Sequence, residues 1–152
     1  MAKQHAGSVE LSPQIHVGVV VKDLNKAIES LSSIFGLGPW DIAERRYPKE
    51  QVEVGKGPFT YKVAFAAMGP VQLELIEVVE GNTIHAEFLR KKGEGIHHIG
   101  FRVPDVRQVV DTLQQYGIGV SQSAFREGAR YAYMDPAGLG GITFEFVQRN
   151  DA

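Results

Sequence analysis

The sequence has no cysteine, no strongly basic block and no long apolar run. Without cysteine, the protein cannot form disulfides, bind zinc through thiolates or use a cysteine nucleophile. The formal net charge of -2 gives no electrostatic support for a nucleic-acid or anionic-membrane partner. The apolar run at residues 17–21 is far shorter than a membrane span, and residues 1–12 lack the apolar segment of a signal peptide. We therefore expect a cytoplasmic protein that acts on a small molecule.

The chain carries an internal repeat. Its 152 residues and 43% hydrophobic content suit one compact domain with a real core. Pairs of like residues recur 82 positions apart: His16 and His98, Gly18 and Gly100, Asp23 and Asp105, Leu31 and Leu113. Glu74 and Glu145 are 71 positions apart, as are Gly69 and Gly140. We therefore expect a flexible tail at residues 1–13, a first module with a linking helix at 14–93 and a second module at 94–149, which together form one domain.

Each module is predicted to be a strand, a helix and three further strands. Asp23 and Asp105 stand at expected helix N-caps. The two helices place apolar residues on one stripe, Leu24, Ala27, Ile28, Leu31 and Phe35 in the first and Val106, Val109, Val110, Leu113 and Tyr116 in the second. The later strands are expected at 40–46, 59–68 and 71–79, and at 119–125, 130–135 and 141–148. A short helix at 83–92 joins the modules, so the fold class is α+β with βαβββ twice.

Strand alternation indicates which polar residues share a face. In the first strand, His16 lies opposite the apolar face of Ile15, Val17 and Val19. By the same alternation His98 matches His16, whereas its neighbour His97 is expected on the helix side. Glu74 and Gln72 lie opposite Leu73 and Leu75, and Glu145 lies opposite Phe144 and Phe146.

Two histidines and two glutamates at repeat-related positions predict one shared site. A carboxylate between large apolar residues is costly unless it is paired or coordinated. Neutral imidazoles and carboxylates together suit a divalent metal. We therefore expect His16, Glu74, His98 and Glu145 to bind one divalent ion per chain, either cobalt, nickel, zinc or manganese. Iron is less favoured, because iron dioxygenases typically use two histidines and one carboxylate.

Four segments resemble the vicinal oxygen chelate superfamily, which contains glyoxalases, bleomycin-resistance proteins and dioxygenases. They are IHVGVVVKDLNKAIE, VQLELIE, FLRKKGEGIHHIGFRV and GGITFEF, and the third looks especially like methylmalonyl-CoA epimerases. The resemblance spans about residues 15–148 and implies a cupped, mostly antiparallel eight-stranded sheet around a metal. It implies the same four ligands and a homodimer. The usual catalytic glutamate of epimerases falls near Pro58 or Phe59, and Glu50 or Glu53 on the preceding loop could replace it.

The expected activity is that of a metal-dependent isomerase or epimerase. It would enolise an acyl-CoA-like or other vicinal-oxygen carbonyl substrate, with Glu145 as the first candidate for the base and Glu74 as a second acid or base. Expected substrate contacts are Arg102, Gln72, Trp40, Phe65 and Met134. Arg126, Arg130 and Lys62 are candidates for contacting a CoA phosphate, and His85 is expected to be exposed. Alternatives are a glyoxalase-like lyase, an iron dioxygenase and a non-catalytic drug-sequestering protein.

Overall fold

A computed structural model describes residues 7–150 of the chain. The first module contains β1 (Ile15–Val20), α1 (Leu24–Phe35), β2 (Asp41–Tyr47), the single-turn helix η1 (Lys49–Gln51), β3 (Val52–Val54), β4 (Phe59–Met68) and β5 (Val71–Glu80). The linking helix is α2 (Ile84–Lys92). The second module contains β6 (Gly95–Arg102), α3 (Val106–Gln115), β7 (Val120–Arg126), β8 (Ala129–Met134) and β9 (Phe144–Arg149). Each predicted strand and helix is present, with ends that shift by up to three residues.

All the strands belong to one curled sheet, in the order β2-β4-β5-β1-β6-β9-β8-β7-β3. The first strands of the two modules, β1 and β6, pair antiparallel at the centre. The pairs β1–β5 and β6–β9 are parallel and the other pairs are antiparallel. The cup is therefore α+β and mostly antiparallel, as predicted. The division of the chain at residue 93 stays a prediction.

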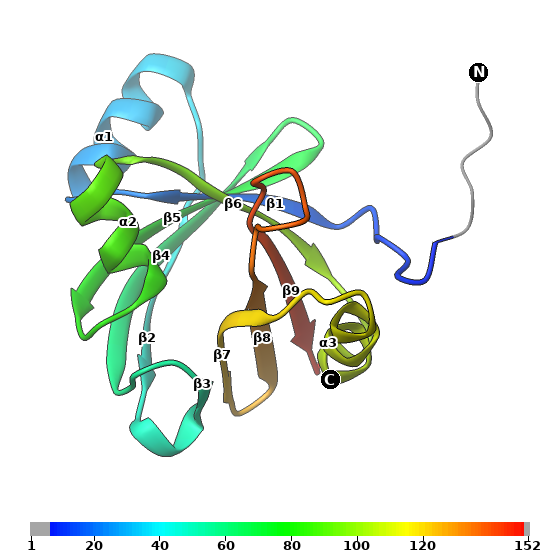
Figure 1. Cartoon of the computed structure of the whole chain (residues 1–152). Coiled ribbons are helices and arrows are strands. Elements are labelled where there is room, and N and C mark those ends of the chain that lie inside the picture. The colour runs from blue at the N-terminus through cyan, green and yellow to red at the C-terminus, as the bar shows by residue number, and fades with distance from the viewer. Residues whose placement is uncertain (1–6, 151–152) are drawn as a thin grey trace, which may run out of the picture.

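The predicted strand count of eight is wrong by one. The additional strand β3 lies in the segment 45–58, which the sequence suggested was a loop, and it pairs with β7 at the end of the sheet. Since β2 also contacts β7, the two ends of the sheet approach one another and the cup is nearly closed. Figure 1 shows this curl, with β2, β3 and β7 at the lower rim.

The helices cover the outer side of the cup at different places. Helix α1 packs on β4 and β5, and α3 packs on β8 and β9; in Figure 1 they lie at opposite ends of the molecule. Asp23 and Asp105 cap these helices by accepting hydrogen bonds from the backbone N–H groups of Lys26 and Gln108. The stripe prediction fails at the last residue of each stripe. Phe35 and Tyr116 are 69% and 65% exposed; Phe35 is the last residue of α1, and Tyr116 is the C-cap residue that follows α3.

No helix within residues 7–150 is both long and apolar enough to cross a membrane. The predicted tail begins in residues 1–6, which lie outside the described part of the chain, and residues 7–13 form no helix or strand.

Candidate metal centre

The four predicted ligands meet because the two central strands pair antiparallel. In one cross-strand row, Glu145 of β9 lies beside Gly100 of β6, which lies beside His16 of β1. In the other, Glu74 of β5 lies beside Gly18 of β1, which lies beside His98 of β6. Each row therefore holds a glutamate from one module, a glycine from the same module and a histidine from the other. The two rows are related by the internal repeat.

The glycine in the middle of each row makes room for the imidazole next to it. A Cβ atom on Gly18 would lie 2.0 Å from Cε1 of His98, and one on Gly100 would lie 1.9 Å from Cε1 of His16. Neither glycine has a positive φ, so the backbone itself does not require glycine. The requirement is steric: each imidazole lies across the neighbouring strand, over the position where any other residue would carry its side chain.

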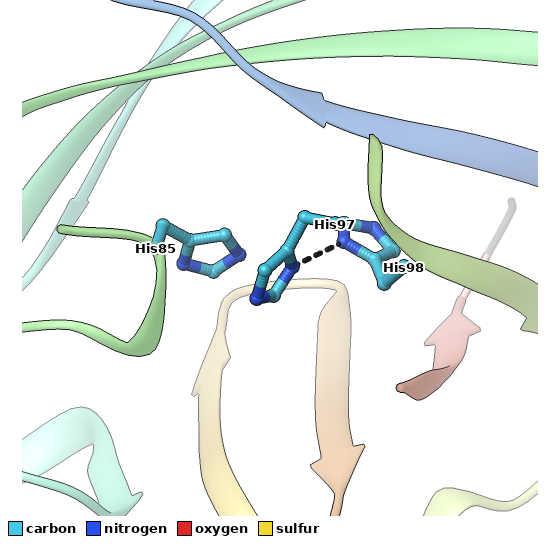
Figure 2. Close-up of side chains that lie close together, drawn as sticks. All are labelled: His85, His97 and His98. Carbon is cyan, nitrogen blue, oxygen red and sulfur yellow. Dashed lines mark hydrogen bonds between the residues drawn. The ribbon is translucent and has the colours of Figure 1, made fainter. Parts of the chain in front are cut away.

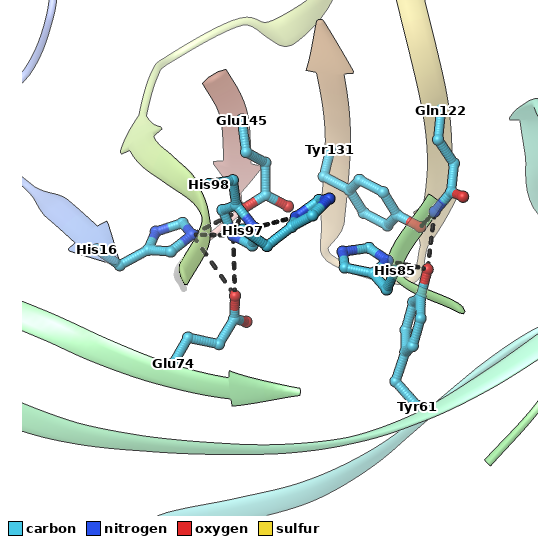
Figure 3. A network of polar contacts seen from close by, with 9 residues as sticks. All are labelled: His16, Tyr61, Glu74, His85, His97, His98, Gln122, Tyr131 and Glu145. Carbon is cyan, nitrogen blue, oxygen red and sulfur yellow. Dashed lines mark hydrogen bonds and ion pairs between the residues drawn. The ribbon is translucent and has the colours of Figure 1, made fainter. Parts of the chain in front are cut away.

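The ligand atoms are close enough together to surround one ion. Nε2 of His16 is 2.7 Å from Oε1 of Glu145 and 3.3 Å from Nε2 of His98. Oε1 of Glu74 is 3.6 Å from Nε2 of His16 and 3.3 Å from Nε2 of His98. With metal–ligand bonds of about 2.1 Å, adjacent ligands lie roughly 3.0 to 3.4 Å apart. We name His16, Glu74, His98 and Glu145 the ligand tetrad; Figure 3 shows the four converging from four strands.

A buried acceptor in the tetrad lacks a hydrogen bond. Oε1 of Glu74 is inaccessible to solvent and has no hydrogen-bond partner, although buried carboxylate oxygens are normally satisfied. A cation at the centre of the tetrad would satisfy this oxygen. The donor set and the orphaned oxygen therefore both fit a divalent metal.

Protons occupy the site when no metal is bound. Burial lowers the pKa of His98, but the nearby carboxylates of Glu145 and Glu74, at 3.4 and 3.3 Å from its Nε2, outweigh burial and raise the pKa to about 9. For His16, burial disfavours the charged form, but the hydrogen bond to Glu145 favours it. The pKa of His16 is raised as a result. Burial acts to raise the pKa of Glu145, yet the bonds from His16 and His98 hold it well below its usual range. Two positive imidazoles can thus balance the two carboxylates until a divalent ion displaces their protons.

His97 and His98 do not face opposite ways, as simple alternation predicts. The pairing of β1 with β6 matches Gly18 with His98 but Val19 with Ile96, so His97 is the extra residue of a β-bulge. A bulge interrupts the alternation and re-aims a side chain. Nδ1 of His97 lies 2.9 Å from Nδ1 of His98, as Figure 2 shows. His97 does contact the linking helix, through Phe88 and His85, but it also contacts a predicted metal ligand.

This contact fixes the orientation of His98. Because Nε2 of His98 points at the two glutamates, a metal there requires the remaining proton on Nδ1, which then donates to Nδ1 of His97. Burial, followed by the charge of His98, lowers the pKa of His97 to about 3, so His97 stays neutral and can accept. Partners of this kind orient metal-binding histidines in many proteins.

The prediction that His85 is exposed is wrong. Its side chain is 0% exposed and contacts the rings of Tyr61, His97 and Tyr133. The hydroxyl of Tyr61 lies 3.1 Å from Nδ1 of His85 and accepts a hydrogen bond from Nε2 of Gln122. Figure 3 shows this chain of polar contacts beside the tetrad. Burial keeps the pKa of His85 well below its usual value, so the α2 helix presents a neutral imidazole behind His97.

A cavity of about 60 Å³ gives access to the tetrad. The carboxylates of Glu74 and Glu145 and the ring of His16 line it. Its other lining residues are inward-facing aromatic and aliphatic side chains and arginines: Arg45, Tyr47, Tyr61, Val63, Phe65, Ile76, Arg126, Ala129, Arg130, Tyr131, Tyr133, Val147 and Arg149.

The five expected substrate contacts fall in three places. Phe65 lines the cavity. Gln72 and Arg102 line a separate hollow beside it, which shares His16, Val147 and Arg149, and Arg102 donates to the backbone oxygen of Arg149. Trp40 packs in the core under α1, and Met134 is fully buried in the core under α3. Of the five expected contacts, Phe65 is therefore the one that lies on the wall of the cavity.

The loop glutamates do not line the cavity. Glu53 pairs with Arg130 and lies near Arg107, and Glu50 is exposed on η1. Phe59 packs among Tyr47 and Tyr61 and, like Pro58, carries no group that can move a proton. Within residues 7–150, the structure thus brings no carboxylate other than Glu74 and Glu145 to the cavity wall.

Sequence reasoning missed most of the cavity wall. Arg45, Tyr47, Tyr61, Tyr131 and Tyr133 all line it. A signal was present, because Tyr61 precedes Phe65 by four residues on one strand face, and Tyr131 and Tyr133 are spaced by two. Burial raises the pKa of Tyr131 and of Tyr133, so these phenols stay protonated at neutral pH.

Comparisons with known proteins agree with the fold. A sequence profile described as Glyoxalase/Bleomycin resistance protein/Dioxygenase superfamily matches residues 15–133. An uncharacterized protein of Bacillus subtilis, YqjC, is 28% identical over 88% of this chain and 89% of its own length. Methylmalonyl-CoA epimerase from Mycobacterium tuberculosis has a TM-score of 0.70 at 24% identity, covering 97% of this chain and 95% of that one.

A further structural neighbour is a variant of Streptomyces coelicolor methylmalonyl-CoA epimerase in complex with 2-nitronate-propionyl-CoA. It has a TM-score of 0.72 at 22% identity, over 93% of this chain and 100% of that chain. These two likenesses show a shared fold. The profile covers most of the chain, so the protein belongs to the Glyoxalase/Bleomycin resistance protein/Dioxygenase superfamily, as the sequence indicated.

Proposed function

We propose that the protein is a divalent-metal-dependent isomerase or epimerase that moves a proton next to a carbonyl group. The observation that carries this proposal is the ligand tetrad at the wall of a cavity, with both of its carboxylates facing the cavity. A bound divalent ion would supply Lewis-acid stabilisation of negative charge on a substrate oxygen. The structural neighbours named as methylmalonyl-CoA epimerases support this reaction class.

The chain supplies the groups that bind and carry the proton. Glu145 is the first candidate for the base, because its carboxylate reaches the cavity and a ligand carboxylate could loosen from a bound metal. Glu74 is the second candidate, because its buried Oε1 has no hydrogen-bond partner and can accept a proton. A base on either side of a planar intermediate allows the proton to return to the opposite face. Phe65 and the four tyrosines line the cavity in which this exchange would occur.

The test is the exchange of a carbon-bound proton with solvent. The metal-loaded protein is incubated in D₂O with vicinal-oxygen carbonyl acids and with methylmalonyl-CoA, and loss of the α-proton signal is followed by NMR. We expect exchange for at least one compound, slowed by roughly 10²-fold or more in Glu145→Gln when both proteins are compared at saturating metal. Unchanged exchange in that variant would refute the role of Glu145.

Other outcomes point to the alternative functions. Consumption of dioxygen by an iron-loaded sample would indicate a dioxygenase, and cleavage of a hemithioacetal would indicate a glyoxalase-like lyase. Tight binding of a small molecule with no exchange would indicate a sequestering protein.

A further inference from the structure

Three arginines from separate strands face the same cavity as the tetrad. Arg45 lies on β2, Arg126 on β7 and Arg149 on β9, and all three line the cavity. We name these three residues the arginine rim. None of them belongs to the metal site, and the proposed proton transfer does not use them.

The sheet register explains why they meet. Arg126 pairs with Ala129, and Ala129 pairs with Arg149, so the two arginines flank a small side chain in one row across β7, β8 and β9. Arg45 joins them because β2 contacts β7 where the cup closes. Arg149 also shares a strand face with Glu145, four residues earlier and therefore about 13 Å away along β9.

Two contacts hold the rim toward the tetrad. The guanidinium of Arg149 lies 5.6 Å from the centre of the Phe65 ring, and Phe65 pairs directly with the metal-ligand candidate Glu74. Burial raises the pKa of Tyr47, and Arg126 lies close enough for its positive charge to act against this rise. The positive groups of Arg149 and Arg126 therefore lie beside the aromatic wall of the cavity.

The charge of the rim is not balanced by protein carboxylates. Arg107 and Arg130 both form ion pairs with Glu53. Among residues 7–150, by contrast, no ion pair joins a rim arginine to a carboxylate. Burial, and then repulsion from Arg126 and Arg149, lowers the pKa of Arg45. Glu74 and Glu145 face the cavity as well, but a divalent ion would neutralise them. Three guanidinium groups would then share one opening without a carboxylate partner, which makes the electrostatic potential there positive and attracts an anion.

We propose that the arginine rim is an oxyanion-binding subsite. The substrate would then be a compact acid that offers vicinal oxygens to the tetrad and carries a second carboxylate or a phosphate at its other end. The end of the substrate that offers vicinal oxygens to the tetrad rests on the proposed function. Guanidinium groups suit the distal anion because their planar forks bind carboxylate and phosphate through paired hydrogen bonds.

The test compares ligands that differ only in the distal group. Binding of 2-oxoglutarate and of 2-oxopentanoate to the metal-loaded protein is measured by calorimetry, together with 3-phosphoglycerate and glycerate. We expect the ligand with the distal anion to bind at least about tenfold more tightly in one of the two pairs, because hydrogen bonds between charged groups are among the strongest in proteins. A preference in the first pair identifies a carboxylate and one in the second identifies a phosphate.

Variants assign that preference to the rim. In Arg126→Met and Arg149→Met, the preference should fall by at least about fivefold while the affinity of the ligand without the distal anion stays the same. Arg46→Met is the matched control, since Arg46 is the exposed neighbour of Arg45 on the other face of β2. Equal affinities within both pairs, or a preference that survives in both rim variants, would overturn the proposal.

A separate measurement distinguishes this failure from failure of the proposed function. Inorganic phosphate is titrated into the metal-free protein, where the tetrad cannot contribute a metal. Saturable phosphate binding that is lost in Arg126→Met supports the rim even if no metal binds and no proton exchange is found. The absence of phosphate binding, together with normal metal uptake and equal affinities within both ligand pairs, would sink the subsite and leave the proposed function standing.

Discussion

At the scale of single residues, the centre depends on two glycines as much as on its four ligands. Gly18 and Gly100 are the spaces into which the rings of His98 and His16 fit. Neither glycine is needed by the backbone, and both lie in the interior of strands, where glycine normally weakens a sheet. The site therefore explains why both modules carry a glycine here: each leaves space for an imidazole of the tetrad.

Replacing Gly100 by alanine should displace His16 without unfolding the protein. The new methyl group would overlap the imidazole, so we expect metal affinity to fall at least tenfold and the unfolding free energy to drop by about 1 to 3 kcal/mol, as for other overpacked sites. Metal titration and thermal unfolding measure the two effects. Gly119→Ala is the control, because a methyl group at Gly119 would meet no atom within 4 Å and the φ of this residue is ordinary. Equal metal affinity in both variants would contradict this account.

A second residue-scale prediction concerns His97. His97→Phe keeps a ring between His85 and Phe88 but removes the acceptor for Nδ1 of His98. We expect metal affinity to fall roughly 10- to 100-fold, the range for lost partners of metal-binding histidines. His97→Asn, which offers an oxygen in place of Nδ1, should restore part of it. If the phenylalanine variant binds metal as well as the unaltered protein, His97 has no orienting role.

At the scale of elements, alternation predicted the strands and the tetrad but not the bulge. The repeat spacing and the apolar faces of residues 71–75 and 144–146 were enough to select His16, Glu74, His98 and Glu145. His97 lies against the linking helix as expected. Its contact with His98 was not predicted, because the bulge arises from how β6 pairs with β1, about 80 residues away in the chain. Burial of His85 has a similar origin: its expected exposure rested on the nearby Glu87, whereas tertiary packing against Tyr61 and Tyr133 encloses the ring.

The arginine rim was also beyond reach of local patterns. Arg126 was noticed as a candidate anion contact, but Arg45 and Arg149 were not. They become neighbours only because the sheet curls until β2 meets β7, and no periodicity within one strand encodes that closure. Strand β3 was missed for a related reason, since its three residues gain their pairing from β7 alone.

At the scale of the whole molecule, the internal repeat makes one site from two modules. Each glutamate is carried by the module that supplies the glycine, and each histidine crosses from the other module. Metal binding should therefore stabilise the association of the two halves of the sheet. Dimerisation stays a prediction.

The pH dependence of stability should reverse when metal binds. In the metal-free protein the pKa of His98 is raised from 6.5 to about 9. Its proton therefore stabilises the fold fully below pH 6.5, and this contribution is lost as the pH rises toward 9. Metal needs the unprotonated imidazole, so the apparent affinity should increase about tenfold per pH unit for each proton displaced. Thermal unfolding between pH 6.5 and 9, with and without metal, measures both trends; parallel curves would contradict the coupling.

The central claim is that the ligand tetrad holds one divalent metal. Elemental analysis of the protein purified without added metal, alongside a His98→Ala variant and the Gly119→Ala control, tests it most directly. We predict about one divalent ion per chain, present in the control and lost in His98→Ala, as for other sites with three or four protein ligands. Absence of metal, with none taken up from cobalt, nickel or zinc, would contradict the account, as would full occupancy in His98→Ala.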